Sequence, residues 1–96
     1  EALRRLDHAV RHDDLTGVLA RRAFMRQGER LLARYGRETS GVAVLRLDVD
    51  HVKQVNDQHG HGAGDQLLIG IASTMASTLR AQDVLGRMGG EEFAVV

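Results

Sequence analysis

The fold is first indicated by ten consecutive residues, Arg87 Met88 Gly89 Gly90 Glu91 Glu92 Phe93 Ala94 Val95 Val96. Two glycines and two acids stand there between apolar flanks, whose residues favour β-strands. An adjacent glycine pair between two such runs is typical of a tight hairpin, because type I′ and II′ turns need the positive φ that glycine adopts without steric cost. We therefore predict strands over residues 84–88 and 92–96, with two carboxylates at the turn that joins them.

These residues resemble the signature of the GGDEF family of diguanylate cyclases, in its GGEEF spelling. Three further segments match the family in order and spacing, so the resemblance spans residues 14–93. Position 52 is Val where the family often has Phe, a change of packing that we expect to be tolerated. The matching segments are Asp14 Leu15 Thr16 Gly17 with Arg21 Arg22 Ala23 Phe24, then Asp48 Val49 Asp50 His51 Val52 Lys53 with Asn56 Asp57, then Gly60 His61 with Gly64 Asp65.

The composition is that of an ordinary soluble domain. The chain has 96 residues, 43% of them hydrophobic, which suffices for one domain with a modest core. Its 13 basic and 13 acidic residues balance, which argues against nucleic acid as a partner. No apolar run approaches the roughly 18 residues of a membrane span, and no signal peptide opens the chain. The absence of cysteine fits a cytoplasmic location. A membrane-attached full-length protein would carry this domain on its cytoplasmic side.

Apolar periodicity predicts the remaining elements and, with them, an α/β fold in which helices pack on a mixed sheet. The resemblance implies a mainly antiparallel sheet flanked by helices, similar to polymerase palm and nucleotidyl cyclase domains, whose C-terminal part lies beyond residue 96. The predicted elements are a helix over residues 21–35 that Gly36 ends, a central strand over 41–49 that is buried on most of its length, a short helix or turn over 53–57, a glycine-rich loop over 59–64 and a second long helix over 65–80.

Residues 1–12 are predicted to form a separate helix, because Leu3, Leu6 and Val10 recur at three and four residues in a narrow coiled-coil stripe. This helix could pack on its own domain, or it could be the end of a signalling helix from an upstream sensory or regulatory domain. We favour the second interpretation, because the chain starts inside the pattern with no cap residue before it. Residues 13–96 would then be the N-terminal part of the catalytic domain.

Two acids are expected to form a metal site. Asp48 at the end of the predicted strand and Glu91 at the hairpin turn could converge from adjacent strands and offer the hard oxygen ligands that Mg²⁺ prefers. The resemblance implies that Asp48, Glu91 and the carbonyl of Val49 bind the metal, which is Mg²⁺, with Mn²⁺ as an alternative. The other interpretation of a strand-end acid is that it is merely solvated.

The catalytic residues follow from the same segments. The resemblance implies that Glu91 accepts the 3′ hydroxyl proton, with Glu92 beside it as the other candidate, and that Lys53 stabilises charge on phosphate. Lys53 is the only lysine of the chain, and amides of a helix N-terminus with an ammonium suit phosphate oxygens. Gly89 and Gly90 lack side chains, so a bulky anionic ligand can approach the backbone there.

Three polar residues are candidates for binding guanine. Asp65 could accept from the N1 and N2 donors of the base, while Asn56 could serve O6. His61 matches a third substrate-contacting position of the family. Structural roles are also open: Asp65 could cap the helix that it opens, and Asn56 could stabilise a turn. Those roles are compatible with base reading.

Arg80 and Asp83 match the inhibitory RxxD motif, through which family members bind their product. The resemblance therefore implies that cyclic di-GMP inhibits at these two residues. Arginine offers bidentate contacts to phosphate or guanine, and an arginine near a helix C-terminus also interacts favourably with the helix dipole.

The sequence thus predicts a diguanylate cyclase domain that condenses two GTP into cyclic di-GMP and two pyrophosphates. Each domain would hold one GTP, so cyclisation would need a homodimer with two sites facing each other across a twofold axis. Two alternatives stay open. One is a receptor domain that binds cyclic di-GMP or GTP without catalysis, and the other is a truncated fragment without activity.

Overall fold

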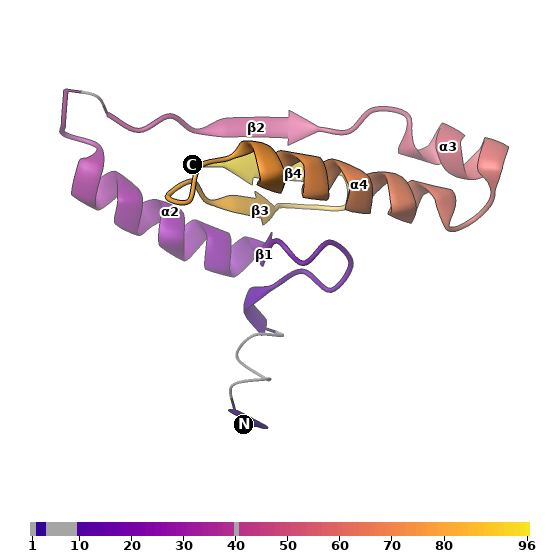
Figure 1. Cartoon of the computed structure of the whole chain (residues 1–96), viewed down its shortest axis with the longest axis horizontal. Helices are drawn as coiled ribbons and strands as arrows, with labels where there is room; N and C mark the ends of the chain where they lie inside the picture. Colours follow the sequence, from indigo (N-terminus) through magenta and orange to yellow (C-terminus); the bar gives the residue numbers. More distant parts are fainter. Residues whose placement is uncertain (1, 4–9, 40) are drawn as a thin grey trace.

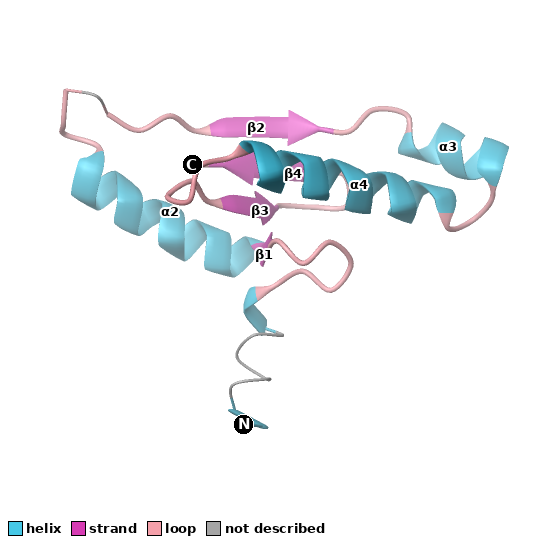
Figure 2. Ribbon diagram, in the orientation of Figure 1, coloured by secondary structure: helices cyan, strands magenta, loops and turns pink. Residues whose placement is uncertain are grey.

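The computed structural model describes residues 2–3, 10–39 and 41–96. Within them the chain forms four strands and three helices, which Figure 1 labels and Figure 2 colours by type. In chain order they are β1 (Leu19–Ala20), α2 (Arg21–Tyr35), β2 (Leu45–Asp48), α3 (Val52–His59), α4 (Ala63–Thr78), β3 (Leu85–Arg87) and β4 (Glu92–Val95).

The strands form one sheet in the order β1-β3-β4-β2. β1 pairs with β3 in parallel, while the β3–β4 and β2–β4 pairs are antiparallel. The prediction of a mixed, mainly antiparallel sheet flanked by helices is confirmed, as is the hairpin formed by β3 and β4. The sequence did not predict β1, because two residues are too few to show a period.

Helices cover both faces of the central strands. Successive strand residues point to opposite faces, and on β3 Leu85 joins a buried cluster with Leu68 of α4, whereas Gly86 lies against Phe24 of α2. α4 and α2 therefore pack on opposite faces of the sheet. The fully buried ring of Phe93 stands at the centre of the α4 side.

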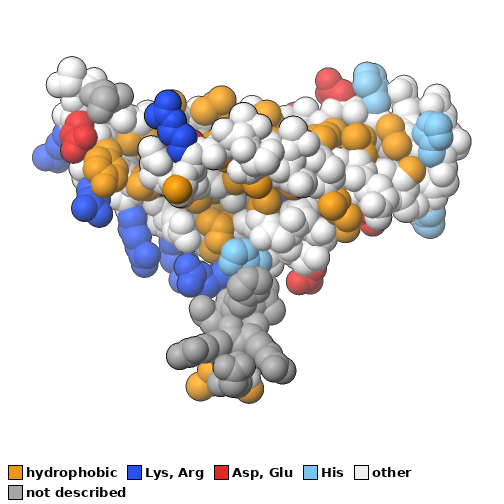
Figure 3. All heavy atoms as spheres, viewed as in Figure 1, with side chains coloured by type: hydrophobic (Ala, Val, Ile, Leu, Met, Phe, Trp, Pro, Cys, Tyr) orange, Lys and Arg blue, Asp and Glu red, His pale blue; other side chains and the backbone are white. Residues whose placement is uncertain are grey.

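The strand predicted over residues 41–49 was expected to be central and buried, and this is wrong for the described residues. β2 spans only Leu45–Asp48, stands at one end of the strand order and is exposed at all four residues. Figure 3 shows hydrophobic side chains at the surface over this strand. A run of Val and Leu is apolar whether its strand has one neighbour or two, so the pattern could not separate an edge strand from a central one.

The two long helices were predicted with different accuracy. α2 has the predicted bounds, and Gly36 caps it by donating from its N–H to Leu32 O at 2.9 Å. α4 begins and ends two residues earlier than expected. It ends at Thr78 because the backbone of Leu79 is extended. No helix of the described residues is long and apolar enough to cross a membrane.

The predicted helix over residues 1–12 falls largely outside the described residues, Leu6 among them. Leu3 and Val10, which are described, expose 82% and 71% of their surface.

Candidate functional site

The predicted metal-binding segments meet where β2 leaves the sheet. Asp48 pairs with Glu92 across the β2–β4 ladder, and the next residue, Val49, donates from its N–H to Glu91 O at 2.9 Å. The structure therefore brings Asp48, Val49 and Glu91 together at one end of the paired strands β2 and β4, as expected from adjacent strands. The side chains of Asp48 and Glu91 are exposed.

The hairpin turn differs from the predicted one. Four residues separate β3 from β4, Met88 N donates to Glu92 O at 2.8 Å, and neither Gly89 nor Gly90 has a positive φ. The prediction of a type I′ or II′ turn is therefore wrong, because a four-residue loop can close without the left-handed backbone that a two-residue loop requires. A Cβ at Gly90 would meet no atom within 4 Å, so the turn is open to an approaching ligand.

Glu92 is held by a cation on the neighbouring strand. Arg46 Nη2 donates to Glu92 Oε2 at 2.6 Å, and this bond raises the pKa of the Arg46 guanidinium. No sequence pattern marks Arg46, because its partner is 46 residues away in the chain. The contact distinguishes the two acids of the signature: Glu92 engages Arg46, whereas Glu91 has no side-chain partner in the part of the chain described.

The lysine and the three base-reading candidates cluster around α3 and the start of α4. Lys53 lies in the first turn of α3, which starts four residues after Asp48 and directly follows His51, whose backbone is left-handed with a φ of 65°. His61 is exposed in the turn between the helices, and Asp65 is exposed in the first turn of α4. Figure 1 shows α3 beyond the end of the sheet toward which the β2 arrow points.

Asn56 closes the N-terminus of α4. Its Oδ1 accepts from Gly64 N at 2.7 Å, while Gly62 at the N-cap position makes no side-chain cap bond. The capping role that was considered for Asp65 is therefore filled by Asn56, for which the sequence suggested the stabilisation of a turn. The bond also fixes the amide orientation, since the oxygen must face the Gly64 N–H, and the Nδ2 donors remain for a ligand acceptor.

The RxxD residues lie at the other end of β3 from the hairpin turn. Arg80 N donates to Asp83 Oδ2 at 2.9 Å and Asp83 N donates to Arg80 O at 3.0 Å, so the two residues form a closed turn after α4. The Arg80 side chain is exposed and contributes only main-chain atoms to that turn.

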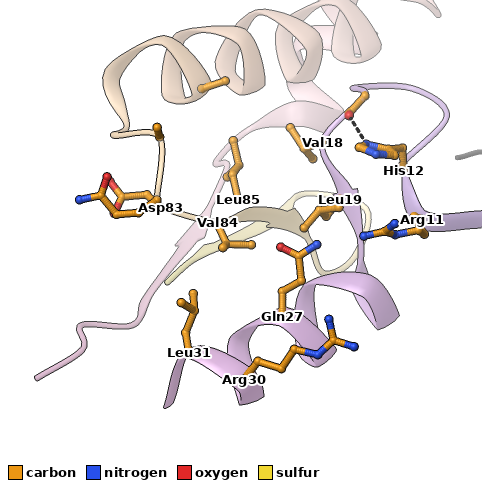
Figure 4. A pocket seen from close by; sticks show the side chains of 14 residues that line it. Arg11, His12, Val18, Leu19, Gln27, Arg30, Leu31, Asp83, Val84 and Leu85 are labelled. Carbon is orange, nitrogen blue, oxygen red and sulfur yellow. Dashed lines mark hydrogen bonds between the residues drawn. The ribbon is translucent and has the colours of Figure 1, made fainter. Parts of the chain in front are cut away.

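A hollow of about 820 Å³ adjoins this turn. It is lined by Asp83, by Gln27 and Arg30 of α2, and by Arg11 and other residues, as Figure 4 shows. Neither Asp48 nor Glu91 lines it. The hollow is therefore separate from the acids at the β2–β4 edge.

No group of three or more His, Cys, Asp or Glu side chains among the described residues could hold a metal by itself. Asp48 and Glu91 supply two carboxylates, and the remaining ligands would have to come from a main-chain carbonyl, water and substrate. That donor set fits Mg²⁺, which protein sites commonly bind through one or two carboxylates plus substrate phosphates.

A family model for the diguanylate cyclase GGDEF domain matches residues 10–96. This chain belongs to the GGDEF family. The probable diguanylate cyclase DgcE of Escherichia coli is 43% identical over 94 residues, which are 98% of this chain and 8% of that protein. The cyclic di-GMP phosphodiesterase NbdA of Pseudomonas aeruginosa is 41% identical over 101 residues, which cover 98% of this chain and 13% of that protein.

Solved structures of GGDEF domains share the fold. The coiled coil and GGDEF domain of DgcB from Caulobacter crescentus, in complex with c-di-GMP, matches with a TM-score of 0.84 and 31% identity. The match covers 98% of this chain and 49% of that one. The GGDEF chain described here thus spans less than half of each of these proteins. The relatives include both a cyclase and a phosphodiesterase by name.

Proposed function

We propose that this chain provides the GTP-binding and metal-binding half of a diguanylate cyclase site, which condenses two GTP into cyclic di-GMP and two pyrophosphates. The observation that carries the proposal is the meeting of Asp48 and Val49 with Glu91 at the β2–β4 edge, through the Asp48–Glu92 pair and the Val49-to-Glu91 hydrogen bond. Membership of the GGDEF family and the relative named a diguanylate cyclase support the reaction class.

Asp48, Glu91 and the Val49 carbonyl would hold Mg²⁺, or Mn²⁺ in its place. When bound, the metal would stabilise negative charge on the triphosphate and make the attacking 3′ hydroxyl more acidic. The exposed carboxylates leave room for phosphate oxygens beside them, and the open turn at Gly90 lets the phosphates approach the main chain.

Glu91 is the better candidate to accept the 3′ hydroxyl proton, through the carboxylate oxygen that would not hold the metal. Glu92 already accepts a 2.6 Å hydrogen bond from Arg46, and a proton acceptor needs a lone pair directed at the substrate. Lys53 in the first turn of α3 would place an ammonium, together with helix N-terminal amides, against phosphate.

Guanine would be read at the junction of α3 and α4. Asn56 keeps its Nδ2 donors for O6 while its Oδ1 caps α4, and the exposed Asp65 accepts from N1 and N2. Adenine presents an acceptor at N1, which the Asp65 carboxylate would repel. His61 lies in the turn between these two residues and would contact the substrate as well.

The assembly and its regulation complete the proposal. Two domains would face each other so that each presents one GTP, and the homodimer would be driven by an upstream sensory domain through the segment before residue 13. Cyclic di-GMP would bind at Arg80 and Asp83 and inhibit the enzyme, and the DgcB structure with c-di-GMP supports product binding by this fold. We place the domain in the cytoplasm.

The test is conversion of GTP with Mg²⁺ by the full-length protein that carries these residues, with cyclic di-GMP quantified by chromatography. We expect Glu91→Gln to lower turnover by roughly 10²- to 10⁴-fold, the usual worth of a general base, and Glu92→Gln to lower it less. Glu29→Gln is the matched control, because Glu29 is an exposed acid of α2 away from the site.

Two results would overturn the proposal. A protein that makes no cyclic di-GMP but binds it, and loses that binding in Arg80→Ala, would be a receptor. A Glu91→Gln variant that turns over GTP like the wild type would place the chemistry elsewhere. The same assay on the 96-residue chain alone shows whether this portion has activity of its own.

A further inference from the structure

Arg87, the last residue of β3, connects two segments that are far apart in the sequence. Its side chain is only 18% exposed, and Nη1 donates to both carboxylate oxygens of Asp13, at 3.1 and 3.2 Å. On its other edge, Nε donates to Gly89 O at 3.2 Å and Nη2 donates to Gly90 O at 2.8 Å. One planar guanidinium therefore holds an upstream carboxylate and two consecutive carbonyls of the hairpin turn.

Asp13 is itself fixed within a closed turn. Its Oδ2 accepts from Thr16 N at 2.9 Å and from Thr16 Oγ1 at 2.7 Å. Its N–H donates to Val18 O at 2.7 Å, and its carbonyl oxygen accepts from Gly17 N at 2.8 Å. Burial acts to raise the pKa of Asp13, but the hydrogen bonds from Thr16 and Arg87 outweigh it and lower the pKa. Arg87 is thus anchored to a rigid, charged partner.

Besides the bonds from Arg87, the hydrogen bonds to the hairpin turn among the described residues come from the main chain, from Met88 N to Glu92 O and from Val49 N to Glu91 O. Gly89 and Gly90 have no side chains to pack, and the space where a Cβ would stand at Gly90 is empty. The next residue, Glu91, is exposed and receives one main-chain hydrogen bond from Val49. The two carbonyls that Arg87 binds belong to the residues directly before Glu91, so their position determines where the main chain of Glu91 lies.

We propose that Arg87 is a positioning residue, which ties the Gly89–Gly90 turn to the Asp13–Thr16 turn and thereby fixes Glu91. The catalytic consequence rests on the function proposed above. Residues 10–12 lead directly into the Asp13 turn, where His12 Nδ1 lies 3.0 Å from Gly17 O. A displacement of that upstream segment would therefore act on the Gly89–Gly90 turn through the ion pair between Asp13 and Arg87.

Only arginine can fill this role at position 87. Its fork presents donors in several directions of one plane, whereas a lysine ammonium is a compact point charge that cannot serve Asp13 and two carbonyls in the same arrangement. Arg87→Lys keeps the charge and removes the fork. Asp13→Asn keeps the shape of the partner and removes its charge. Arg26→Lys, at an exposed site on α2, is the matched control.

The experiment combines two measurements on the full-length protein. The first is amide hydrogen exchange at Val49 and Met88, whose N–H groups bond to Glu91 O and Glu92 O, with amides of α4 as internal reference. We expect Arg87→Lys and Asp13→Asn to speed exchange there by about tenfold or more, the effect of losing a charge-assisted hydrogen bond. Exchange in α4 and in the Arg26→Lys variant should stay unchanged.

The second measurement is steady-state turnover of GTP. We expect Arg87→Lys to lower kcat by roughly 10- to 100-fold, as a misplaced catalytic group does. KM for GTP should change by a smaller factor than kcat, because the base contacts proposed for Asn56 and Asp65 are untouched. Asp13→Asn combined with Arg87→Lys should be no worse than Arg87→Lys alone, since the two residues act through one contact.

The results separate this inference from the proposed function. Unchanged exchange at Val49 and Met88 in Arg87→Lys overturns the connection, and faster exchange with intact kcat overturns its role in positioning Glu91. Fully additive losses in the double variant show that Asp13 does not act through Arg87. A wild type without cyclase activity contradicts the proposed function, while faster exchange in Arg87→Lys would still support the connection between the two turns.

Discussion

Gly86 of β3 lies directly against the side chain of Phe24 of α2. A Cβ at position 86 would come within 2.5 Å of Phe24 Cβ, 2.6 Å of Cγ and 2.7 Å of Cδ1. Both residues are buried, with Phe24 at 4% exposure. The fit between α2 and the sheet therefore depends on the absence of a side chain at Gly86.

Gly86→Ala is expected to destabilise the fold by about 1–3 kcal/mol, because a methyl group would force Phe24 out of place. Gly70→Ala is the matched control, since a Cβ at this exposed site of α4 would meet no atom within 4 Å. Alanine should stabilise that helix by about 0.5–1 kcal/mol. Denaturant unfolding of both variants measures the two effects, and equal changes would contradict the packing described.

Substitutions of Asn56 should separate its two roles. Asn56→Asp keeps an oxygen for the Gly64 N–H but loses the amide donors, so we expect normal thermal stability and GTP affinity lowered about tenfold or more. Asn56→Ala removes both functions and should also cost about 1 kcal/mol of stability, as the loss of a helix cap does. Calorimetric GTP titration and thermal unfolding check these expectations. Wild-type GTP affinity in Asn56→Asp would exclude a role in base reading.

Arg80→Ala should weaken cyclic di-GMP binding by about tenfold or more, the worth of a charged hydrogen bond, and leave the unfolding temperature unchanged. The reason is that the closed turn uses only main-chain atoms of Arg80. Asp83→Ala should lower both the affinity for cyclic di-GMP and the unfolding temperature. The unfolding temperature falls because the Asp83 carboxylate accepts the hydrogen bond from Arg80 N that closes the turn. Titration with cyclic di-GMP measures the effect, and undiminished binding in Arg80→Ala would place the product elsewhere.

Because of Asp13, the free energy of unfolding should depend on pH in the acid range. Burial acts to raise its pKa, but the bonds from Thr16 and Arg87 bring the folded pKa below the ordinary value of 3.8. A depressed pKa stabilises the fold above the unfolded value, and this contribution is lost as the pH falls through the folded pKa.

The comparison that tests this dependence is between the wild type and Asp13→Asn, by denaturant unfolding from neutral pH downwards. The free-energy difference should stay constant well above the unfolded pKa of Asp13 and shrink as the pH falls from there through the folded pKa, below which both side chains are neutral. Two curves that stay parallel through the acid range would show that Asp13 titrates alike in the folded and unfolded chain.

The sequence predicted those parts of the fold that depend on local order. The bounds of α2 were predictable because an apolar face repeats with the helical period and Gly36 follows it. The meeting of the β2 end with the hairpin was predictable from motifs that place one acid at the end of a strand and another in the turn of a hairpin. The α3–α4 junction was predictable as the place of the polar residues that could read a base.

Other features depend on contacts between distant residues and leave no periodic signal. The bond from Arg87 to Asp13 joins residues 74 apart in sequence, and Arg46 reaches Glu92 across 46 residues. Whether β2 is an edge strand depends on the order of strands in space. The glycine pair was misinterpreted because its backbone conformation depends on loop length, which residue type alone does not fix.

The pairing of Asp48 with Glu92 also bears on the order in which the protein folds. All of α3, α4 and β3 lie between these two residues in the chain. The contact between α3 and α4 is local, whereas the β2–β4 ladder closes a long loop, and contacts of high sequence separation form slowly. During synthesis, the elements proposed to bind the base emerge and associate first, and the two carboxylate-bearing segments meet only after β4 has left the ribosome.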